Sequence, residues 1–156
     1  METAHITTPL GIAKIMGNEN GISIISISNE GKVSLKIPTI LQEAVLQLNE
    51  YFEGKREIFD FKLNPAGTEF QQKVWRALLE IPFGKTISYM ELSKKLGDVK
   101  AIRAVASANG KNPIWIVVPC HRVIATDGSL TGYAGGLWRK KWLLEHENPS
   151  NQGSLF

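Results

Sequence analysis

The feature that most constrains the fold of this chain is the change of sequence pattern at Asn64-Pro65-Ala66-Gly67. Before this stretch, β-branched residues alternate with polar ones between short turns, which is the pattern of half-buried strands. After it, segments of helical periodicity follow one another with clear start and stop signals. A stretch rich in Pro and Gly between two such patterns marks a linker. We therefore predict a first domain over residues 1–64, a second over 65–149 and a flexible tail over 150–156.

The first domain is predicted to be a small sheet with one helix. Residues 2–28 have the composition and spacing of successive strands, with a turn at Gly17–Gly21. The segment Thr39–Phe52 is typical of an amphipathic helix, because its apolar residues recur every three to four positions: Ile40, Ala44, Leu48 and Tyr51. One further strand is expected at Ile58, Phe59 and Phe61.

The second domain is predicted to be mainly helical, because capping residues mark its helix starts. Thr68–Gln71 and Ser88–Glu91 both have the spacing of a capping box. The first of these helices is expected to reach Leu79, and Asp98 is expected to cap a third helix over about residues 100–109. Two short helices joined by a tight turn form a helix-turn-helix, a pattern found in DNA-binding proteins and in others.

Charge is unevenly distributed between the two domains. Residues 1–64 contain six Lys or Arg against eight Asp or Glu, whereas residues 65–156 contain twelve against seven. A basic half favours a polyanionic partner. The hydrophobic fraction of 43% is that of a globular protein, and no apolar run approaches the ~20 residues of a membrane span.

The only cysteine, Cys120, follows the apolar segment Ile116–Pro119 and precedes His121 and Arg122. One cysteine cannot form an internal disulfide or a Cys-rich zinc site, so it is either a buried structural residue or a nucleophile. The adjacent imidazole and guanidinium favour a nucleophile, because a thiol needs a base or a positive environment to become a thiolate. Pro119 is expected to interrupt strand pairing before it. A free thiol without a signal peptide also indicates the cytoplasm.

The hexapeptide Pro119-Cys120-His121-Arg122-Val123-Ile124 resembles the active-site signature of the O6-alkylguanine-DNA alkyltransferases, or methylated-DNA–protein-cysteine methyltransferases. The resemblance extends from about Thr68 to Glu147 and includes several motifs in the family's order. It implies a ribonuclease-H-like α/β N-terminal domain, with a small sheet plus a helix, and a mainly α winged-helix/helix-turn-helix C-terminal domain. It further implies direct-reversal DNA repair, in which the alkyl group of O6-alkylguanine moves irreversibly to Cys120 in a single turnover; O4-alkylthymine stays open as a second substrate.

The resemblance assigns roles in the transfer to five residues. Cys120 would attack as the thiolate, His121 would take the thiol proton through a water, and Glu147 would orient His121. Tyr89 would donate a hydrogen bond to guanine N3, and Asn112 would brace the turn between the two DNA-binding parts. From the residues alone, Tyr89 is better explained as a first-turn helix residue, and Asn112 is equally an ordinary turn residue. Glu147 could be a solvated helix end, but that is an electrostatically poor place for an acid, which favours a functional role.

The helix expected near residues 100–109 has small side chains and one arginine, Arg103. Such a helix suits the minor groove better than the major groove, which is read by long polar side chains, although packing through its alanines explains it equally well. In the family, the matching arginine replaces a flipped nucleotide in the base stack. The predicted DNA-binding face comprises Lys100, Ala101, Arg103, Ala104 and Ser107.

The stretch Thr131–Gly136 matches the family's active-site loop, in which glycines permit close approach to the base. The substrate pocket is predicted to include Val123, Gly132, Tyr133 and Ala134. No cofactor is expected, and no zinc, because the zinc ligands of some members include N-terminal cysteines that this chain lacks. The thioether product is a poor leaving group, so the protein is expected to act once.

The terminal segment Gln152-Gly153-Ser154-Leu155-Phe156 suits a disordered tail and also resembles the peptide by which bacterial proteins dock on the sliding clamp. Three other functions compete with alkyl transfer. A non-catalytic protein that binds alkylated DNA and recruits repair proteins is disfavoured by Cys120, and a Cys-His hydrolase by the short chain. A helix-turn-helix regulator would bind a specific DNA sequence even after Cys120→Ala.

Overall fold

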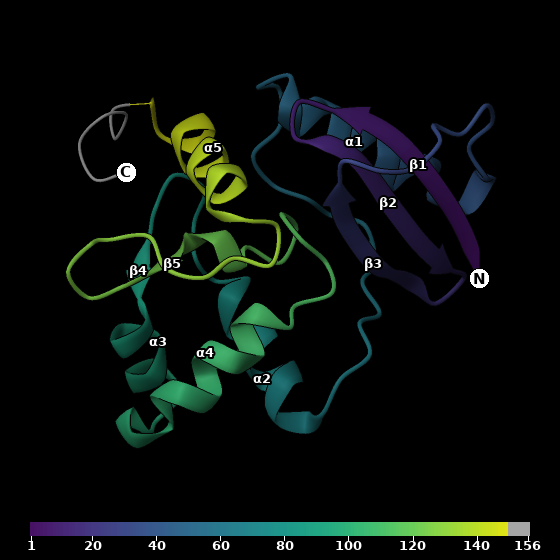
Figure 1. Ribbon diagram of the computed structural model, residues 1–156. Coiled ribbons are helices and arrows are strands. Elements are labelled where there is room, and N and C mark those ends of the chain that lie inside the picture. The colour runs from purple at the N-terminus through teal and green to yellow at the C-terminus, as the bar shows by residue number, and fades with distance from the viewer. Residues whose placement is uncertain (150–156) are drawn as a thin grey trace. The chain divides into compact units, whose positions relative to one another are not determined.

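The computed structural model describes residues 1–149, and the tail resembling a clamp-binding peptide lies outside them. The chain divides into two compact units, Met1–Ala66 and a second unit that begins at Gly67 (Figure 1). Each unit has its own set of buried apolar side chains. Pro65 and Ala66 belong to the first unit.

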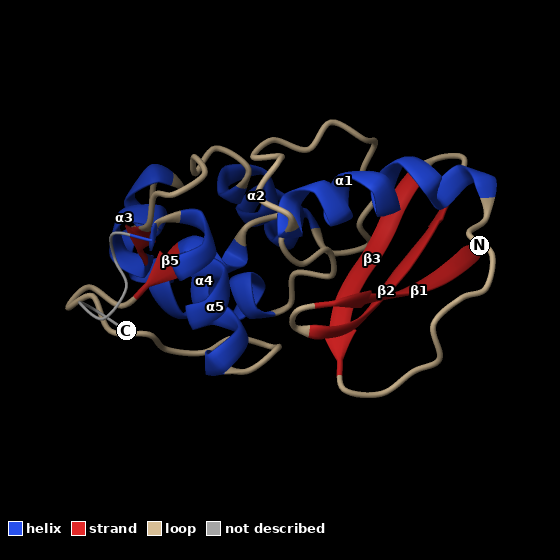
Figure 2. Ribbon diagram, turned by 90° about the horizontal axis from the view of Figure 1, so that it is seen from above, coloured by secondary structure: helices blue, strands red, loops and turns tan. Residues whose placement is uncertain are grey.

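The first unit contains a three-stranded antiparallel sheet in the order β1-β2-β3, formed by β1 (Glu2–Thr8), β2 (Gly11–Asn18) and β3 (Gly21–Ser28). Its register pairs Ala4 with Ile15 and Ile15 with Ile25, and all three side chains are fully buried. The short 3-10 helix η1 (Thr39–Leu41) and helix α1 (Gln42–Phe52) follow, and α1 lies across one face of the sheet (Figure 2). The predicted sheet-plus-helix domain is confirmed.

Two details of the first unit differ from the sequence prediction. Ile40 does not face the core; it is exposed, and Leu41 is buried in its place because the first turn is a 3-10 turn. The predicted strand at Ile58–Phe61 is wrong: in this region only Leu63 forms a bridge, to Ile22. The aromatic residues instead form a cluster in which the Phe59 ring packs against Tyr51 and Phe61.

The second unit is mainly helical. Its elements are α2 (Glu69–Leu78), β4 (Ile87–Ser88), α3 (Tyr89–Lys95), the 3-10 helix η2 (Val99–Ala101), α4 (Ile102–Gly110), the 3-10 helix η3 (Cys120–Arg122), β5 (Val123–Ile124) and α5 (Leu137–Glu147). Both predicted capping boxes are present, with Thr68 and Ser88 as the N-caps of α2 and α3. Asp98 caps η2 rather than α4 itself, which starts two residues later than expected.

Two contacts place the ends of these elements near one another. The Trp75 indole of α2 donates a 2.9 Å hydrogen bond to the carbonyl of Ala108 in α4. Strands β4 and β5 pair in parallel, with Ile87 opposite Val123, so the start of α3 lies beside the segment that follows Cys120. None of the helices within residues 1–149 has the length and apolarity to cross a membrane.

Candidate active site

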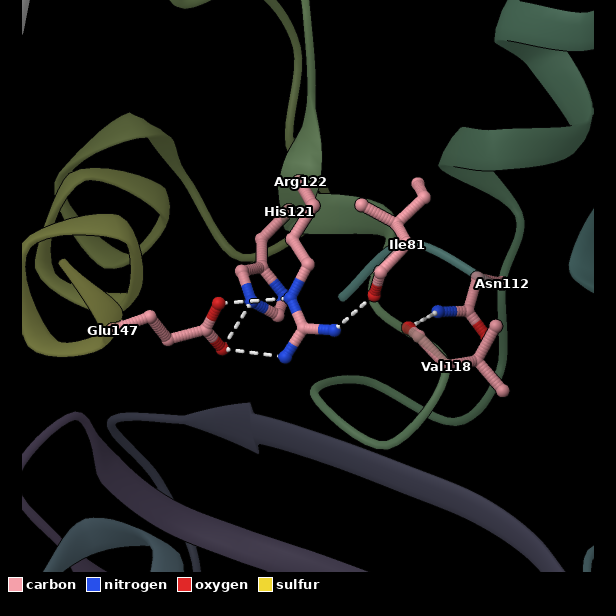
Figure 3. Close-up of polar contacts among 6 residues, drawn as sticks. All are labelled: Ile81, Asn112, Val118, His121, Arg122 and Glu147. Atoms are coloured by element: carbon pink, nitrogen blue, oxygen red, sulfur yellow. Dashed lines mark hydrogen bonds and ion pairs between the residues drawn. The ribbon is translucent and has the colours of Figure 1, made fainter. Parts of the chain in front are cut away.

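The segment that leads to Cys120 is buried, as predicted, but it is not a strand. Residues 115–118 form turns, and Ile116 has a φ of 74°, which a β-branched residue rarely adopts. The Asn112 side chain braces this turn: its Oδ1 accepts from the Ile114 amide at 2.9 Å, and its Nδ2 donates to the Val118 carbonyl at 2.7 Å (Figure 3). Cys120 then begins η3.

Cys120 lies at a pocket of about 510 Å³. The walls of this pocket come from α3, α4 and the loop before α5, and they include Tyr89, Ile102, Arg103, Asn109, Gly132, Tyr133 and Ala134. The thiol is 4% exposed, and burial raises its pKa to about 11, although Asn112 and the Lys140 charge act in the opposite direction. The resting thiol is therefore protonated and needs a base before it can attack.

His121 and Arg122, which follow Cys120 in the chain, form a buried hydrogen-bonded network with Glu147 (Figure 3). His121 Nε2 lies 2.8 Å from Glu147 Oε2. Arg122 donates from Nε to Glu147 Oε1 at 2.8 Å and from Nη2 to Oε2 at 3.0 Å. The third guanidinium nitrogen, Nη1, donates to the carbonyl of Ile81 at 2.6 Å. Glu147 is thus a buried carboxylate that is hydrogen-bonded to His121 and Arg122 rather than a solvated helix end.

The charge state of this network determines which nitrogen of His121 can act as a base. Burial alone would raise the pKa of Glu147, but His121 and Arg122 overcome that effect and hold it well below its usual range. An ionised Glu147 only accepts hydrogen bonds, so the neutral imidazole carries its proton on Nε2. Among residues 1–149, no group forms a hydrogen bond with the buried Nδ1 of His121, so its lone pair is available to accept a proton.

The predicted DNA-binding residues lie together on η2 and α4. Lys100, Arg103, Ala104 and Ser107 are exposed, and Ala101 is half-buried. Arg103 also borders the pocket that holds Cys120, as do Ile102 and Ala106. Helix α4 therefore exposes the Arg103 cation to solvent and also forms part of the pocket wall.

The predicted substrate residues are brought together with one exception. Gly132, Tyr133 and Ala134 line the pocket, and the Tyr89 hydroxyl reaches the carbonyl of Thr131 at 3.3 Å. Val123 is fully buried and does not line the pocket, because its carbonyl accepts a 2.7 Å hydrogen bond from Lys140. Burial raises the pKa of both Tyr89 and Tyr133, which keeps these phenols protonated.

Sequence reasoning missed two residues of this site, Lys140 and Asn109, and assigned Arg122 to the thiol. Arg122 instead turns away to Glu147, and the cation whose charge acts on the thiol is Lys140 of α5. Asn109 of α4, which is 4% exposed, donates from Nδ2 to the Cys120 carbonyl at 3.4 Å. A signal was available for α5, since Lys140 and Glu147 lie in line with the buried Leu143 and Leu144 at helical spacing. Charged residues in an apolar stripe are seldom solvated.

Together these features define a class of protein: a helix-turn-helix protein with a buried cysteine at a pocket, followed in the chain by a histidine that is hydrogen-bonded to a buried carboxylate. Within residues 1–149, no cluster of three or more His, Cys, Asp or Glu side chains could hold a metal ion.

Comparison with known proteins identifies the family. Residues 69–149 match the 6-O-methylguanine DNA methyltransferase, DNA binding domain, and residues 2–65 match the ribonuclease-like domain of the same enzymes. The chain belongs to the 6-O-methylguanine DNA methyltransferase family, as the resemblance of its active-site hexapeptide implied.

Individual relatives agree with this assignment. The methylated-DNA–protein-cysteine methyltransferase of Methanosarcina barkeri is 47% identical over 149 residues, which cover 91% of this chain and 94% of the relative. The crystal structure of Mycobacterium tuberculosis O6-methylguanine methyltransferase has 42% identity and a TM-score of 0.85, covering 99% of this chain and 96% of its own. The structure of the M. tuberculosis protein in complex with DNA has 43% identity and a TM-score of 0.86, with 96% and 94% covered.

Proposed function

We propose that this protein repairs O6-alkylguanine in double-stranded DNA by transferring the alkyl group irreversibly to Cys120. The observation that carries the proposal is the position of the Cys120 thiol, at a pocket whose wall includes the DNA-binding helix α4 and with a His121–Glu147 pair behind it. The close relatives that bear the name methylated-DNA–protein-cysteine methyltransferase support the same reaction.

The transfer follows from the charges of the site. His121 Nδ1 takes the Cys120 proton through a water, and the ionised Glu147 stabilises the resulting imidazolium. The thiolate attacks the alkyl carbon, a carbon–sulfur bond forms, and the carbon–O6 bond breaks with its electrons moving to the guanine. Tyr89 donates a hydrogen bond to N3 of the departing guanine, which regains a proton and becomes normal guanine. In the net reaction, the alkyl group replaces hydrogen on the Cys120 sulfur, and hydrogen replaces the alkyl group on the guanine.

Access to the pocket requires the damaged nucleotide to leave the base stack. We place α4 in the minor groove, because Arg103 is its one long exposed side chain, beside the short exposed Ala104 and Ser107. Arg103 borders both the pocket and the solvent, so its guanidinium can occupy the position that the flipped base vacates and stack on the neighbouring bases. Gly132 has no side chain, so the loop that contains it and lines the pocket can approach the flipped base closely.

The reaction ends with the first transfer. A thioether is a poor leaving group, and the chain has one cysteine, so no second thiol can remove the alkyl group from Cys120. We infer a stoichiometric reagent that needs no cofactor and is consumed in use. A cytoplasmic location fits this chemistry, since a free thiol persists in a reducing compartment.

The competing functions lack a supporting observation. A non-catalytic recruitment protein has no use for a thiol backed by a base and a carboxylate, and hydrolysis does not explain the helix-turn-helix. Whether O4-alkylthymine is also a substrate can be decided by placing it in a duplex in place of O6-methylguanine and measuring the mass gain of the protein.

We also propose that residues Gln152–Phe156 dock on the sliding clamp, from their resemblance to clamp-binding peptides. Clamp retention in a pull-down should be lost when residues 151–156 are deleted. Retention by the truncated chain would reject the proposal.

The experiment for alkyl transfer is intact-protein mass spectrometry after mixing with a duplex that contains one O6-methylguanine. We expect a gain of one methylene unit, located on Cys120 by peptide mapping and limited to one equivalent. Cys120→Ser is the matched control, because it keeps the shape of the site and removes the soft nucleophile. Tight binding of wild-type protein without mass gain would instead support recruitment.

A further inference from the structure

Arg122 is the residue of the site whose contacts the transfer mechanism above does not use. It is 6% exposed, and all three of its guanidinium nitrogens donate hydrogen bonds: Nε and Nη2 to Glu147, and Nη1 to the carbonyl of Ile81. The Phe83 ring lies 5.8 Å from the guanidinium carbon. A buried side chain held from three directions has a fixed position, and that position is set by the Ile81–Phe83 turn.

The geometry at Glu147 Oε2 links Arg122 to the base. This single oxygen accepts from His121 Nε2 at 2.8 Å and from Arg122 Nη2 at 3.0 Å, while Oε1 accepts from Arg122 Nε at 2.8 Å. The two-pronged contact fixes the plane of the carboxylate, because guanidinium and carboxylate are both planar and match in spacing. The carboxylate in turn fixes the imidazole ring.

The charge balance of the buried network gives Arg122 a second effect. With Arg122, Glu147 and a neutral His121, the resting network has no net charge. Without the arginine, the same network would carry one buried negative charge, and uptake of a proton by His121 would neutralise it. His121 would then be protonated before the thiol could transfer its proton.

We propose that Arg122 is a positioning residue that keeps Glu147 oriented and balances its buried negative charge, so that Nδ1 of His121 is free to accept the Cys120 proton. The proposal deepens the alkyl-transfer function and rests on it. Tyr133 also senses Glu147: burial raises the pKa of its phenol, the charges of Cys120 and Glu147 raise it further, and Arg139 lowers it. A phenol that stays neutral does not replace the charge of Arg122.

The test measures the single-turnover transfer rate between pH 5 and 9 for wild type, Arg122→Met and Arg122→Lys. Arg122→Met removes the charge, so the acid limb of the pH–rate profile should move up by about one pH unit. Arg122→Lys keeps a positive charge without the two-pronged contact, so its rate should fall by roughly tenfold while the acid limb stays in place.

Imidazole nitrogen chemical shifts of His121 provide a readout that does not require transfer. Wild type should show the Nε2–H tautomer near neutral pH, and Arg122→Met should show imidazolium at the same pH. A slower Arg122→Met with an unmoved acid limb and a neutral imidazole would overturn the proposal. If Arg122→Met does not fold, a wild-type rate in Arg122→Lys would overturn it as well. Failure of the wild type to transfer at all would refute alkyl transfer, and the His121 shifts would still test Arg122.

Discussion

Lys140 donates a 2.7 Å hydrogen bond to the carbonyl of Val123, and both residues are fully buried. The same ammonium reaches the carbonyls of Thr131 at 3.0 Å and Gly132 at 3.3 Å. Within residues 1–149 it forms no ion pair with a carboxylate. One buried cation therefore holds the loop that lines the pocket against β5, and its charge acts on the thiol of Cys120.

The first prediction concerns the pH dependence of stability that Lys140 creates. Burial lowers the pKa of Lys140 from 10.5 to about 8, so between these values the unfolded chain binds the proton and the folded chain does not. Stability from this group must therefore rise with pH across that window. We expect wild type to gain about 2 kcal/mol relative to Lys140→Met between pH 7.5 and 10, measured by urea unfolding. The prediction would be contradicted if the free energies of unfolding of wild type and Lys140→Met changed with pH in parallel.

The second prediction concerns Glu147. Glu147→Gln leaves the Arg122 charge buried without a counter-ion, so the free energy of unfolding at pH 7 should fall by about 3 kcal/mol. The pKa of Glu147 is depressed, so its contribution is complete above the unfolded value of 4.5 and is lost as the pH falls below it. The gap between wild type and Glu147→Gln should therefore shrink by about 1.4 kcal/mol at pH 3.5. A gap that is constant with pH would show that the carboxylate charge is not involved.

The third prediction uses the two capping boxes as a matched pair. Ser88→Ala and Thr68→Ala each remove an N-cap that accepts from the third residue of its helix, so each should cost about 1 kcal/mol in chemical denaturation. Only Ser88 directly precedes a pocket residue, Tyr89, at the start of α3. Transfer should slow in Ser88→Ala and not in Thr68→Ala. Equal transfer rates in the two variants would mean that the cap of α3 does not position Tyr89.

The fourth prediction separates base flipping from chemistry. Arg103→Ala should slow transfer from an O6-methylguanine duplex by at least about tenfold, because the vacated stack loses its replacement side chain. Transfer from an unpaired single strand, where the base is already accessible, should change much less. Exposed Lys100 offers the control: Lys100→Ala should weaken binding to both substrates, with the larger loss at low salt. A similar loss on both substrates for Arg103→Ala would place the arginine in phosphate binding.

Local signals were sufficient for the helix starts and for the strands of the first unit. A capping box or an alternating strand is specified by residues within a few positions, so the caps at Thr68 and Ser88 and the strands within residues 2–28 follow from nearby sequence. Ile58 to Phe61 look like a strand by composition, yet Phe59 is used to pack on Tyr51. The aromatic pattern does not distinguish the two uses.

The predicted site depends on family resemblance for its long-range contacts. Nothing local brings Glu147 to His121, 26 positions away, or turns Arg122 from the neighbouring thiol to the carboxylate. The turn at Ile116 was hidden because an apolar β-branched run favours a strand, whereas the Asn112 side chain holds a backbone that β-branched residues avoid. Lys140 required knowledge of which face of α5 is buried.

Helix α4 carries Arg103 near its start and Asn109 near its end, and Asn109 is hydrogen-bonded to the carbonyl of Cys120. Asn109 follows Arg103 by six positions, which is about 9 Å along the axis. In the proposed mechanism, this spacing sets how far a nucleotide must travel from the gap that Arg103 enters to the sulfur that receives its alkyl group. A residue inserted within the segment would lengthen that path and rotate Arg103 by about 100° around the axis, away from the vacated gap. In the proposed mechanism, the length of α4 therefore fixes the distance between the residue that enters the duplex and the residue that contacts Cys120.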